Sequence, residues 1–71
     1  NITVNVVTPG YISTETVAGL TEEQKARIMT WIPQGHFGES EDVADMVGFL
    51  ASEKASYVTG QVISVDGGMA I

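Results

Sequence analysis

Cysteine is absent from the 71 residues, and histidine occurs once, as His36. Without cysteine the chain forms no disulfide and no thiolate metal centre, and a lone histidine has no second one with which to share a metal. A chain this short buries only about 60% of the surface that its unfolded form exposes, and small folds often compensate with such crosslinks. We therefore expect the chain to pack unusually well, to assemble with copies of itself, or to be part of something larger.

Basic residues are also scarce, since three lysines and arginines stand against nine acids and the formal net charge is −6. This balance argues against binding to nucleic-acid phosphates and to anionic membranes, because both need clustered Lys and Arg. The apolar runs are too short to span a bilayer. The sequence also lacks the basic segment followed by an apolar one that is typical of a secretory signal. We expect a cytoplasmic protein without a nucleic-acid or membrane partner.

Familiar catalytic and phosphate-binding motifs are absent as well. No Gly-rich turn of the dinucleotide-binding type follows a predicted strand, and neither a P-loop nor a Gly-x-Ser-x-Gly turn occurs. Tyr11 and Tyr57 are followed four residues later by Glu15 and Gln61 rather than by lysine. We therefore predict no catalytic residue and no metal site in this chain.

The residues that are present predict an α/β segment. A β-branched run over 2–7 predicts a strand that is ended by Pro9-Gly10, a strong turn signal. Residues 11–20 predict a loop with a short helical turn. Because chains rarely begin inside a buried strand, the start at Asn1 suggests a fragment or a cleaved product.

Two helices are predicted next. The first begins at Thr21, which with Gln24 forms a capping-box pattern, and Pro33 stops it. The second has Ser40 as its N-cap and ends near 52–54. Its apolar residues recur at helical spacing and their neighbours widen the stripe, so we expect burial on more than one side. The stripe is Val43, Met46, Val47 and Leu50, and the widening residues are Ala44, Gly48, Phe49 and Ala51.

A last strand is predicted over 61–65, closed by Asp66-Gly67-Gly68. Two strands joined by a long helical crossover favour parallel pairing in one α/β sheet. Such a sheet carries helices on both faces, and this chain predicts too few helices for that. We take this as a second indication that further sequence belongs to the domain, and we interpret Asp66 as a turn residue rather than a catalytic base.

The segment after the first predicted strand is the most informative, and its candidate binding residues are Pro9, Gly10, Ile12 and Thr14. Ligands of open α/β sheets lie beyond the carboxyl ends of the strands. There, backbone groups after a turn can hydrogen-bond a flat amide, and a threonine can add a hydroxyl, which suits a nicotinamide carboxamide. Ordinary turn and helix-cap chemistry is the alternative explanation of the same residues.

Several blocks together resemble the short-chain dehydrogenase/reductase family, in its order and at its spacing, over nearly the whole chain. They are Asn5-x-x-x-Pro9-Gly10-x-Ile12-x-Thr14, Ile32-Pro33-x-Gly35-x-Phe37-Gly38, Glu41-Asp42-Val43-Ala44, Phe49-Leu50-Ala51-Ser52, Tyr57-Val58-Thr59-Gly60-Gln61 and Val65-Asp66-Gly67-Gly68-Met69. The resemblance implies the C-terminal part of a Rossmann-type, doubly wound parallel sheet. One departure is His36, where relatives commonly carry arginine.

The resemblance implies binding roles for residues 1–14, which would form a strand and the nicotinamide loop. Pro9 and Gly10 would lie against the nicotinamide, and Ile12 would offer its backbone to the carboxamide. Thr14 would hydrogen-bond the carboxamide or the pyrophosphate. The cofactor implied is NADP, with NAD as the alternative.

Roles for the rest of the chain follow from the same resemblance. Residues 15–33 would form a mobile lid over the substrate. Residues 40–71 would form the last helix and strand. Asn5 would tie the first strand to its neighbours. The helix over 42–52 and the strand over 61–66 would pack against other subunits of a homotetramer. The chain would also pack against the remainder of its own domain.

The implied activity is hydride transfer from a reduced nicotinamide to the ketone of an acyl thioester. Within the family the likeness is greatest to bacterial reductases of 3-oxoacyl groups on acyl carrier protein. The alternatives are an acetoacetyl-CoA reductase, a dehydrogenase of another alcohol, sugar or steroid, and a non-catalytic fragment that folds only on a partner chain. Met29, Trp31 and Phe37 are candidates for lining an acyl pocket, with core packing as the alternative.

Overall fold

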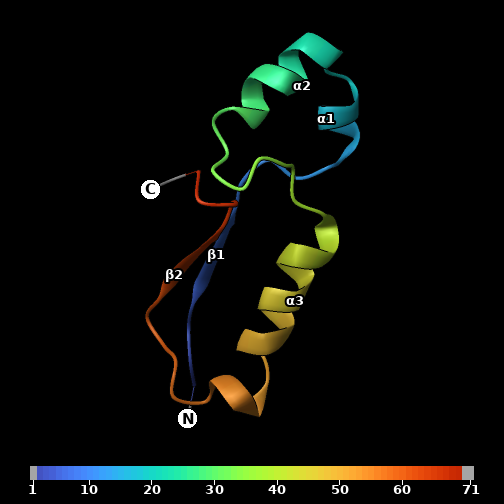
Figure 1. Cartoon of the computed structure of the whole chain (residues 1–71). Coiled ribbons are helices and arrows are strands. Elements are labelled where there is room, and N and C mark those ends of the chain that lie inside the picture. The colour runs from blue at the N-terminus through green and yellow to red at the C-terminus, as the bar shows by residue number, and fades with distance from the viewer. Residues whose placement is uncertain (1, 70–71) are drawn as a thin grey trace.

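The computed structural model describes residues 2–69. The molecule is elongated, 48 × 23 × 14 Å, with a sheet and a long helix in one half and two short helices in the other (Figure 1). Its elements in chain order are β1 (Val6–Pro9), α1 (Glu15–Ala18), α2 (Glu22–Met29), α3 (Ser40–Leu50), the 3-10 helix η1 (Glu53–Ala55) and β2 (Val62–Val65).

The two strands pair in parallel, as the helical crossover between them predicts. Val6 lies opposite Val62 and Pro9 opposite Val65, so the carboxyl ends of the two strands lie side by side. The last strand was predicted over 61–65 and forms within those bounds. The α/β class and the parallel pairing are therefore confirmed for the described residues.

The bounds predicted for the first strand, 2–7, are wrong, because pairing begins at Val6 and continues through Pro9. Proline can occupy this place because the N–H groups that point toward β2 belong to alternate residues. Gly10 donates its N–H to the carbonyl of Val65 at 3.0 Å, so the missing N–H of Pro9 removes no bond from this pair. The chain therefore turns after Gly10 rather than at the proline.

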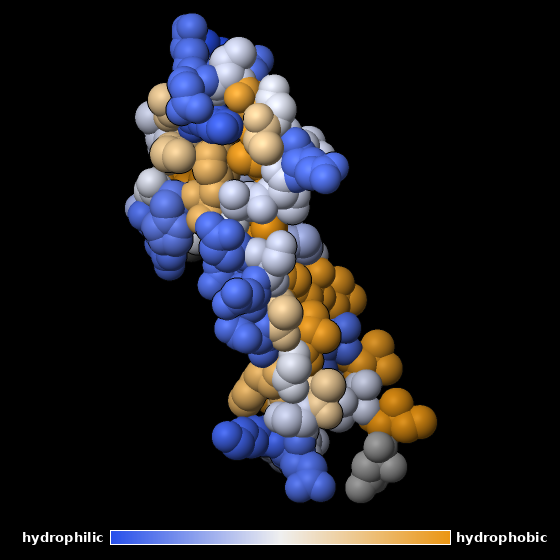
Figure 2. Space-filling view, turned by 90° about the vertical axis from the view of Figure 1, so that its right-hand side faces the viewer, coloured by the Kyte–Doolittle hydropathy of each residue, from blue (hydrophilic) through white to orange (hydrophobic). Residues whose placement is uncertain are grey.

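Helix α3 lies against one face of the sheet, and the other face is open in the described part of the chain (Figure 1). Side chains alternate between the two faces, so Val7 and Val65 are half-buried on the side of α3. The open side carries exposed aliphatic residues, and Figure 2 shows apolar surface gathered in this half of the molecule. These exposed residues are Ile2, Val4, Val6 and Val62.

The prediction that α3 is buried on more than one side is wrong for residues 2–69. No residue of α3 is buried, and Val47 and Phe49 are 50% and 45% exposed. A Cβ built on Gly48 would meet no neighbour within 4 Å, so the described chain provides no close contact there. The apolar pattern of the helix is real, but this chain alone does not cover it.

The ends of α3 also differ from the prediction. Its N-cap is Glu39 rather than Ser40, and the Asp42 carboxylate accepts the Glu39 N–H at 2.7 Å. Carboxylates suit this position because the helix N-terminus carries partial positive charge. The helix ends at Leu50, before the predicted 52–54, because the chain there turns into η1.

The end of the molecule that holds the two short helices contains three of the four buried apolar residues found among residues 2–69. Val17 from α1 and Ile28 from α2 are buried, and so is Ile32 just beyond α2. The predicted capping box is confirmed: Gln24 donates its N–H to the Thr21 hydroxyl at 3.1 Å, and its side chain accepts the Thr21 N–H at 3.0 Å. This unit spans most of residues 15–33, which the resemblance singled out.

Asn5 ties the chain before β1 to the chain before β2, as the resemblance implies. Its side-chain amide donates to the carbonyl of Val58 at 3.2 Å, and its side-chain oxygen accepts the N–H of Gln61 at 3.0 Å. These two bonds join segments more than 50 residues apart in sequence and set where β2 begins its pairing.

Replacing Asn5 by alanine removes both bonds and leaves two backbone groups without these partners. We expect the free energy of unfolding of the intact protein to fall by about 1–3 kcal/mol, measured by urea denaturation. Gln61→Ala is the control, because that side chain bonds only the exposed Thr59 carbonyl and should change stability by less than about 0.5 kcal/mol. Equal effects of the two substitutions would contradict the role given to Asn5.

Candidate functional site

All four predicted binding residues line one cleft at the carboxyl end of β1. The cleft has a volume of about 590 Å³ and lies where α1 and the first turns of α3 approach the loop after β1. Pro9, Gly10, Ile12 and Thr14 contribute from the loop side. Its other lining residues are Tyr11, Thr16, Val17, Ser40, Val43 and Ala44. The cleft therefore sits beyond a strand end, where open α/β sheets bind ligands.

Gly10 brings the ends of the two strands into close contact. A Cβ at this position would lie 2.6 Å from the Cβ of Asp66 and 2.8 Å from its Cα. Real side chains do not approach this closely, so only glycine fits between the strand ends. The φ angle of Gly10 is not in the left-handed region, so close approach is the reason for glycine here.

Ile12 forms an isolated parallel bridge with Gly38, which closes the base of the loop between them. Gly38 donates to the carbonyl of Tyr11 at 3.0 Å, and Ser13 donates to the carbonyl of Gly38 at 2.8 Å. In such a bridge the N–H and C=O of the middle residue point away from the partner strand. Among residues 2–69, neither group of Ile12 has a hydrogen-bond partner.

Thr14 precedes α1 and occupies its N-cap position, but its hydroxyl makes no capping hydrogen bond. Its carbonyl accepts the N–H of Ala18 at 2.9 Å, so the backbone supports the helix while the hydroxyl does not. The side chain is exposed. The helix-cap alternative for Thr14 is therefore not supported, because the hydroxyl remains available in the cleft.

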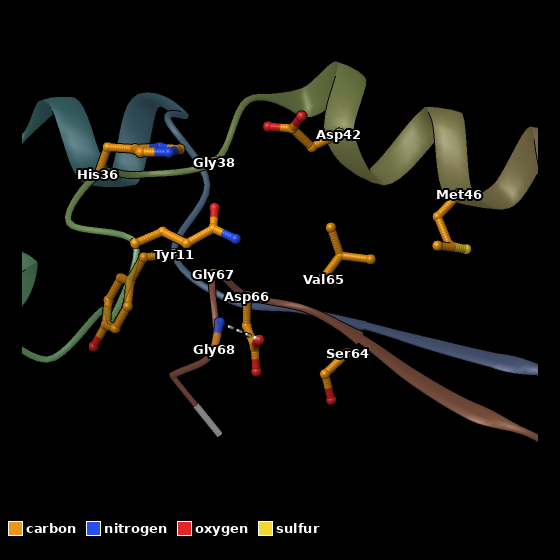
Figure 3. A pocket seen from close by; sticks show the side chains of 11 residues that line it. Tyr11, His36, Gly38, Asp42, Met46, Ser64, Val65, Asp66, Gly67 and Gly68 are labelled. Carbon is orange, nitrogen blue, oxygen red and sulfur yellow. Dashed lines mark hydrogen bonds between the residues drawn. The ribbon is translucent and has the colours of Figure 1, made fainter. Parts of the chain in front are cut away.

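A second cleft, of about 550 Å³, lies at the carboxyl end of β2, and Figure 3 shows its lining. Asp42 and Met46 reach into it from α3, and Val65 points toward them from β2. The Asp66 carboxylate accepts the N–H of Gly68 at 3.0 Å. This bond confirms the interpretation of Asp66 as a turn residue.

The remaining candidates are placed around these clefts. His36 is exposed and donates from Nδ1 to the carbonyl of Phe37 at 2.9 Å. Phe37 packs edge-on against Tyr11, with ring centroids 6.3 Å apart, while Trp31 is 52% exposed. Within residues 2–69, no three acidic or histidine residues gather as metal ligands, and no helix is long and apolar enough to cross a membrane.

Comparison with known proteins identifies the class of this chain. A family model described as enoyl-(acyl carrier protein) reductase matches residues 1–70. This model belongs to the short-chain dehydrogenases and reductases, and the chain is therefore a member of the short-chain dehydrogenase/reductase family.

Individual relatives carry a more specific name. The chain is 54% identical over 69 residues to a 3-oxoacyl-(acyl-carrier-protein) reductase of Aquifex aeolicus, and 52% identical over 68 residues to the Haemophilus influenzae protein of the same name. A Staphylococcus aureus protein, also so named, is 50% identical over 68 residues. These matches cover 96–97% of the chain but only 28% of each relative.

The contact at Gly10 gives a prediction about the cleft. Gly10→Ala forces the strand ends apart and should lower the free energy of unfolding of the intact protein by about 1–3 kcal/mol. Gly19→Ala is the matched control, since Gly19 has a helical φ of −76° and an added Cβ would meet its nearest neighbour at an ordinary 3.5 Å. Thermal unfolding of both variants tests this, and an unchanged Gly10→Ala protein would disprove the close approach.

Proposed function

We propose that this chain is the C-terminal segment of an NADPH-dependent reductase of 3-oxoacyl thioesters carried on acyl carrier protein. The segment would bind the nicotinamide end of the cofactor and cover the acyl substrate. The catalytic proton donor would come from outside these residues, since no Tyr-x-x-x-Lys pair occurs among them. A reduced nicotinamide supplies a hydride to the carbonyl carbon when it is bound.

The backbone of Ile12 is the observation that carries this proposal. A nicotinamide carboxamide has one acceptor oxygen and one donor nitrogen, and the unused N–H and C=O of Ile12 offer the complementary pair. The Thr14 hydroxyl stands in the same cleft as a third polar group. Pro9 and Gly10 would form the flat wall against which the ring lies.

The names of the relatives favour a 3-oxoacyl over an enoyl substrate. The description of the family model names an enoyl reductase. The individual relatives, which share about half of their aligned residues with this chain, are instead named as 3-oxoacyl reductases. Both names specify an acyl group on acyl carrier protein, so the carrier is common to them. The stronger individual likeness leads us to the ketone as the reacting group.

The lid and the rest of the domain follow from the same proposal. Residues 15–33 lie beside the proposed nicotinamide cleft, to which α1 contributes Thr16 and Val17. In this proposal they would move as a unit over the substrate. The open face of the sheet, with exposed Val4, Val6 and Val62, would receive helices from the remainder of the domain and complete a doubly wound sheet.

The proposed activity is tested by following NADPH oxidation with a 3-oxoacyl thioester in the intact protein. We expect turnover in the wild type and, in Thr14→Val, a KM for NADPH raised about tenfold, because a hydrogen bond to the cofactor is lost. Thr16→Val is the matched control, since Thr16 lines the same cleft from α1. Absence of wild-type turnover with any 3-oxoacyl thioester, or equal effects of the two valines, would contradict the proposal.

We further propose that the intact protein is a homotetramer in which α3 and β2, near the predicted 42–52 and 61–66, pack against other subunits. The apolar residues Val47 and Phe49 are exposed along α3, and Gly48 lies between them. Glycine inside a helix costs about 1 kcal/mol relative to alanine. A close helix contact from another subunit would explain why it stands there.

Gly48→Ala distinguishes an interface from a solvent-facing helix. If another helix packs closely at Gly48, the added methyl group should weaken assembly by about tenfold in dissociation constant, measured by analytical ultracentrifugation. Glu23→Ala, at an exposed position of α2 in the other half of the molecule, is the control and should leave assembly unchanged. An intact assembly with stability raised by about 1 kcal/mol would show that Gly48 faces solvent.

A further inference from the structure

The stems of the 15–33 lid and the turn after β2 meet at one place, visible in Figure 1 where the loops converge below α1 and α2. The first stem, residues 11–13, is bridged to Gly38 in the second stem, residues 34–38. The second stem is also bonded to the turn, because Gln34 donates its N–H to the carbonyl of Gly67 at 3.1 Å. The lid is therefore anchored to the end of β2 as well as to β1.

The contact between this turn and the lid leaves no space for a side chain. A Cβ built on Gly67 would lie 2.7 Å from Cγ2 of Ile32 and 3.6 Å from Cβ of Gln34. The Cγ2 methyl is attached directly to Cβ and cannot swing aside as the end of a long side chain can. Gly67 also has a φ of 64°, so its backbone and its surroundings both require glycine.

Ile32 transmits this contact into the body of the lid. It is 4% exposed and, like Val17 and Ile28, it is one of the buried residues of the 15–33 segment. Because Ile32 is enclosed by its neighbours, it has little free space into which its side chain alone can move. Pushing Ile32 away from Gly67 would therefore move the lid rather than deform it locally.

We propose that Gly67 is a positioning residue that sets the resting position of the substrate lid through Ile32. This inference rests on the proposed function, in which residues 15–33 cover the acyl group. Neither Gly67 nor Ile32 lines the nicotinamide cleft, and neither takes part in the bridge between Ile12 and Gly38. Disturbing Gly67 should therefore weaken acyl-substrate binding while leaving the binding of NADPH unchanged.

The test compares Gly67→Ala with Gly60→Ala in the intact protein. Gly60 has a similar φ of 72° but has open space where a Cβ would stand, so it reproduces the backbone strain without the contact. We expect the KM for the 3-oxoacyl thioester to rise about fivefold in Gly67→Ala only, with less than about twofold change in the KM for NADPH. Adding Ile32→Leu, which removes Cγ2 and keeps the side-chain volume, should restore the substrate KM.

A second readout follows the lid without relying on activity. Trp31 is next to Ile32 and is the only tryptophan of this chain, so 5-fluorotryptophan labelling gives a ¹⁹F signal from the lid, assigned with Trp31→Phe. Gly67→Ala should shift this signal, and Gly60→Ala should not. If Gly67→Ala does not fold, the double variant Gly67→Ala/Ile32→Leu should fold, because the methyl group that the new Cβ would meet is gone.

The outcomes separate this inference from the proposed function. The same substrate KM and ¹⁹F signal in Gly67→Ala and Gly60→Ala would overturn the role of Gly67, and so would a double variant Gly67→Ala/Ile32→Leu that, like Gly67→Ala, does not fold. A wild type without 3-oxoacyl reductase activity would instead overturn the proposed function. In that case the ¹⁹F comparison would still decide whether Gly67 positions residues 15–33.

Discussion

The close approach of Gly10 to Asp66 is the constraint on which the arrangement of this chain depends. Parallel pairing brings the carboxyl ends of β1 and β2 together, and at that point the two backbones leave no room for a side chain between them. Gly10 lines one cleft and Asp66 lines the other, and the loops that carry the lid leave from this contact. Both clefts and both stems thus take their positions from one backbone contact.

Features that depend on neighbouring residues were predictable from the sequence. The Thr21–Gln24 capping box forms as predicted because both partners lie within one helical turn. Parallel pairing was predictable because a long helical crossover favours it. The gathering of Pro9 to Thr14 in one cleft also followed, since the carboxyl end of a strand has a known relation to ligand sites.

Features set by distant segments were not predictable. Residues 2–5 are as rich in β-branched side chains as the strand itself, but pairing starts only at Val6, where β2 comes alongside. Ser40 and Glu39 can both cap a helix, and the side chain of Asp42 decides between them by accepting the N–H of Glu39. The apolar stripe of α3 predicted burial of the helix, but it did not show that residues 2–69 leave Val47 and Phe49 about half exposed.

In the candidate site, too, local features were predictable from the sequence and contacts between distant segments were not. The four candidate residues came from the sequence, whereas the unused hydrogen-bonding groups of Ile12 depend on its bridge to Gly38, which no local pattern reveals. The packing of Ile32 against Gly67 was likewise invisible, because the two residues lie in separate loops. The glycine was recognisable as a turn residue, but the sequence did not show what it faces.

The bonds made by Asn5 bear on how this chain folds. They join residues more than 50 positions apart, and the two strands meet across an equally long loop. Closing such a loop has an entropic cost that grows slowly with its length and precedes any strand pairing, so contacts of this kind form slowly. The capped helix α2 needs only its own neighbours and can form much sooner. The order of events thus differs from the order of the elements: α2, in the middle of the chain, can form first, whereas the first strand pairs only after the last strand has been made.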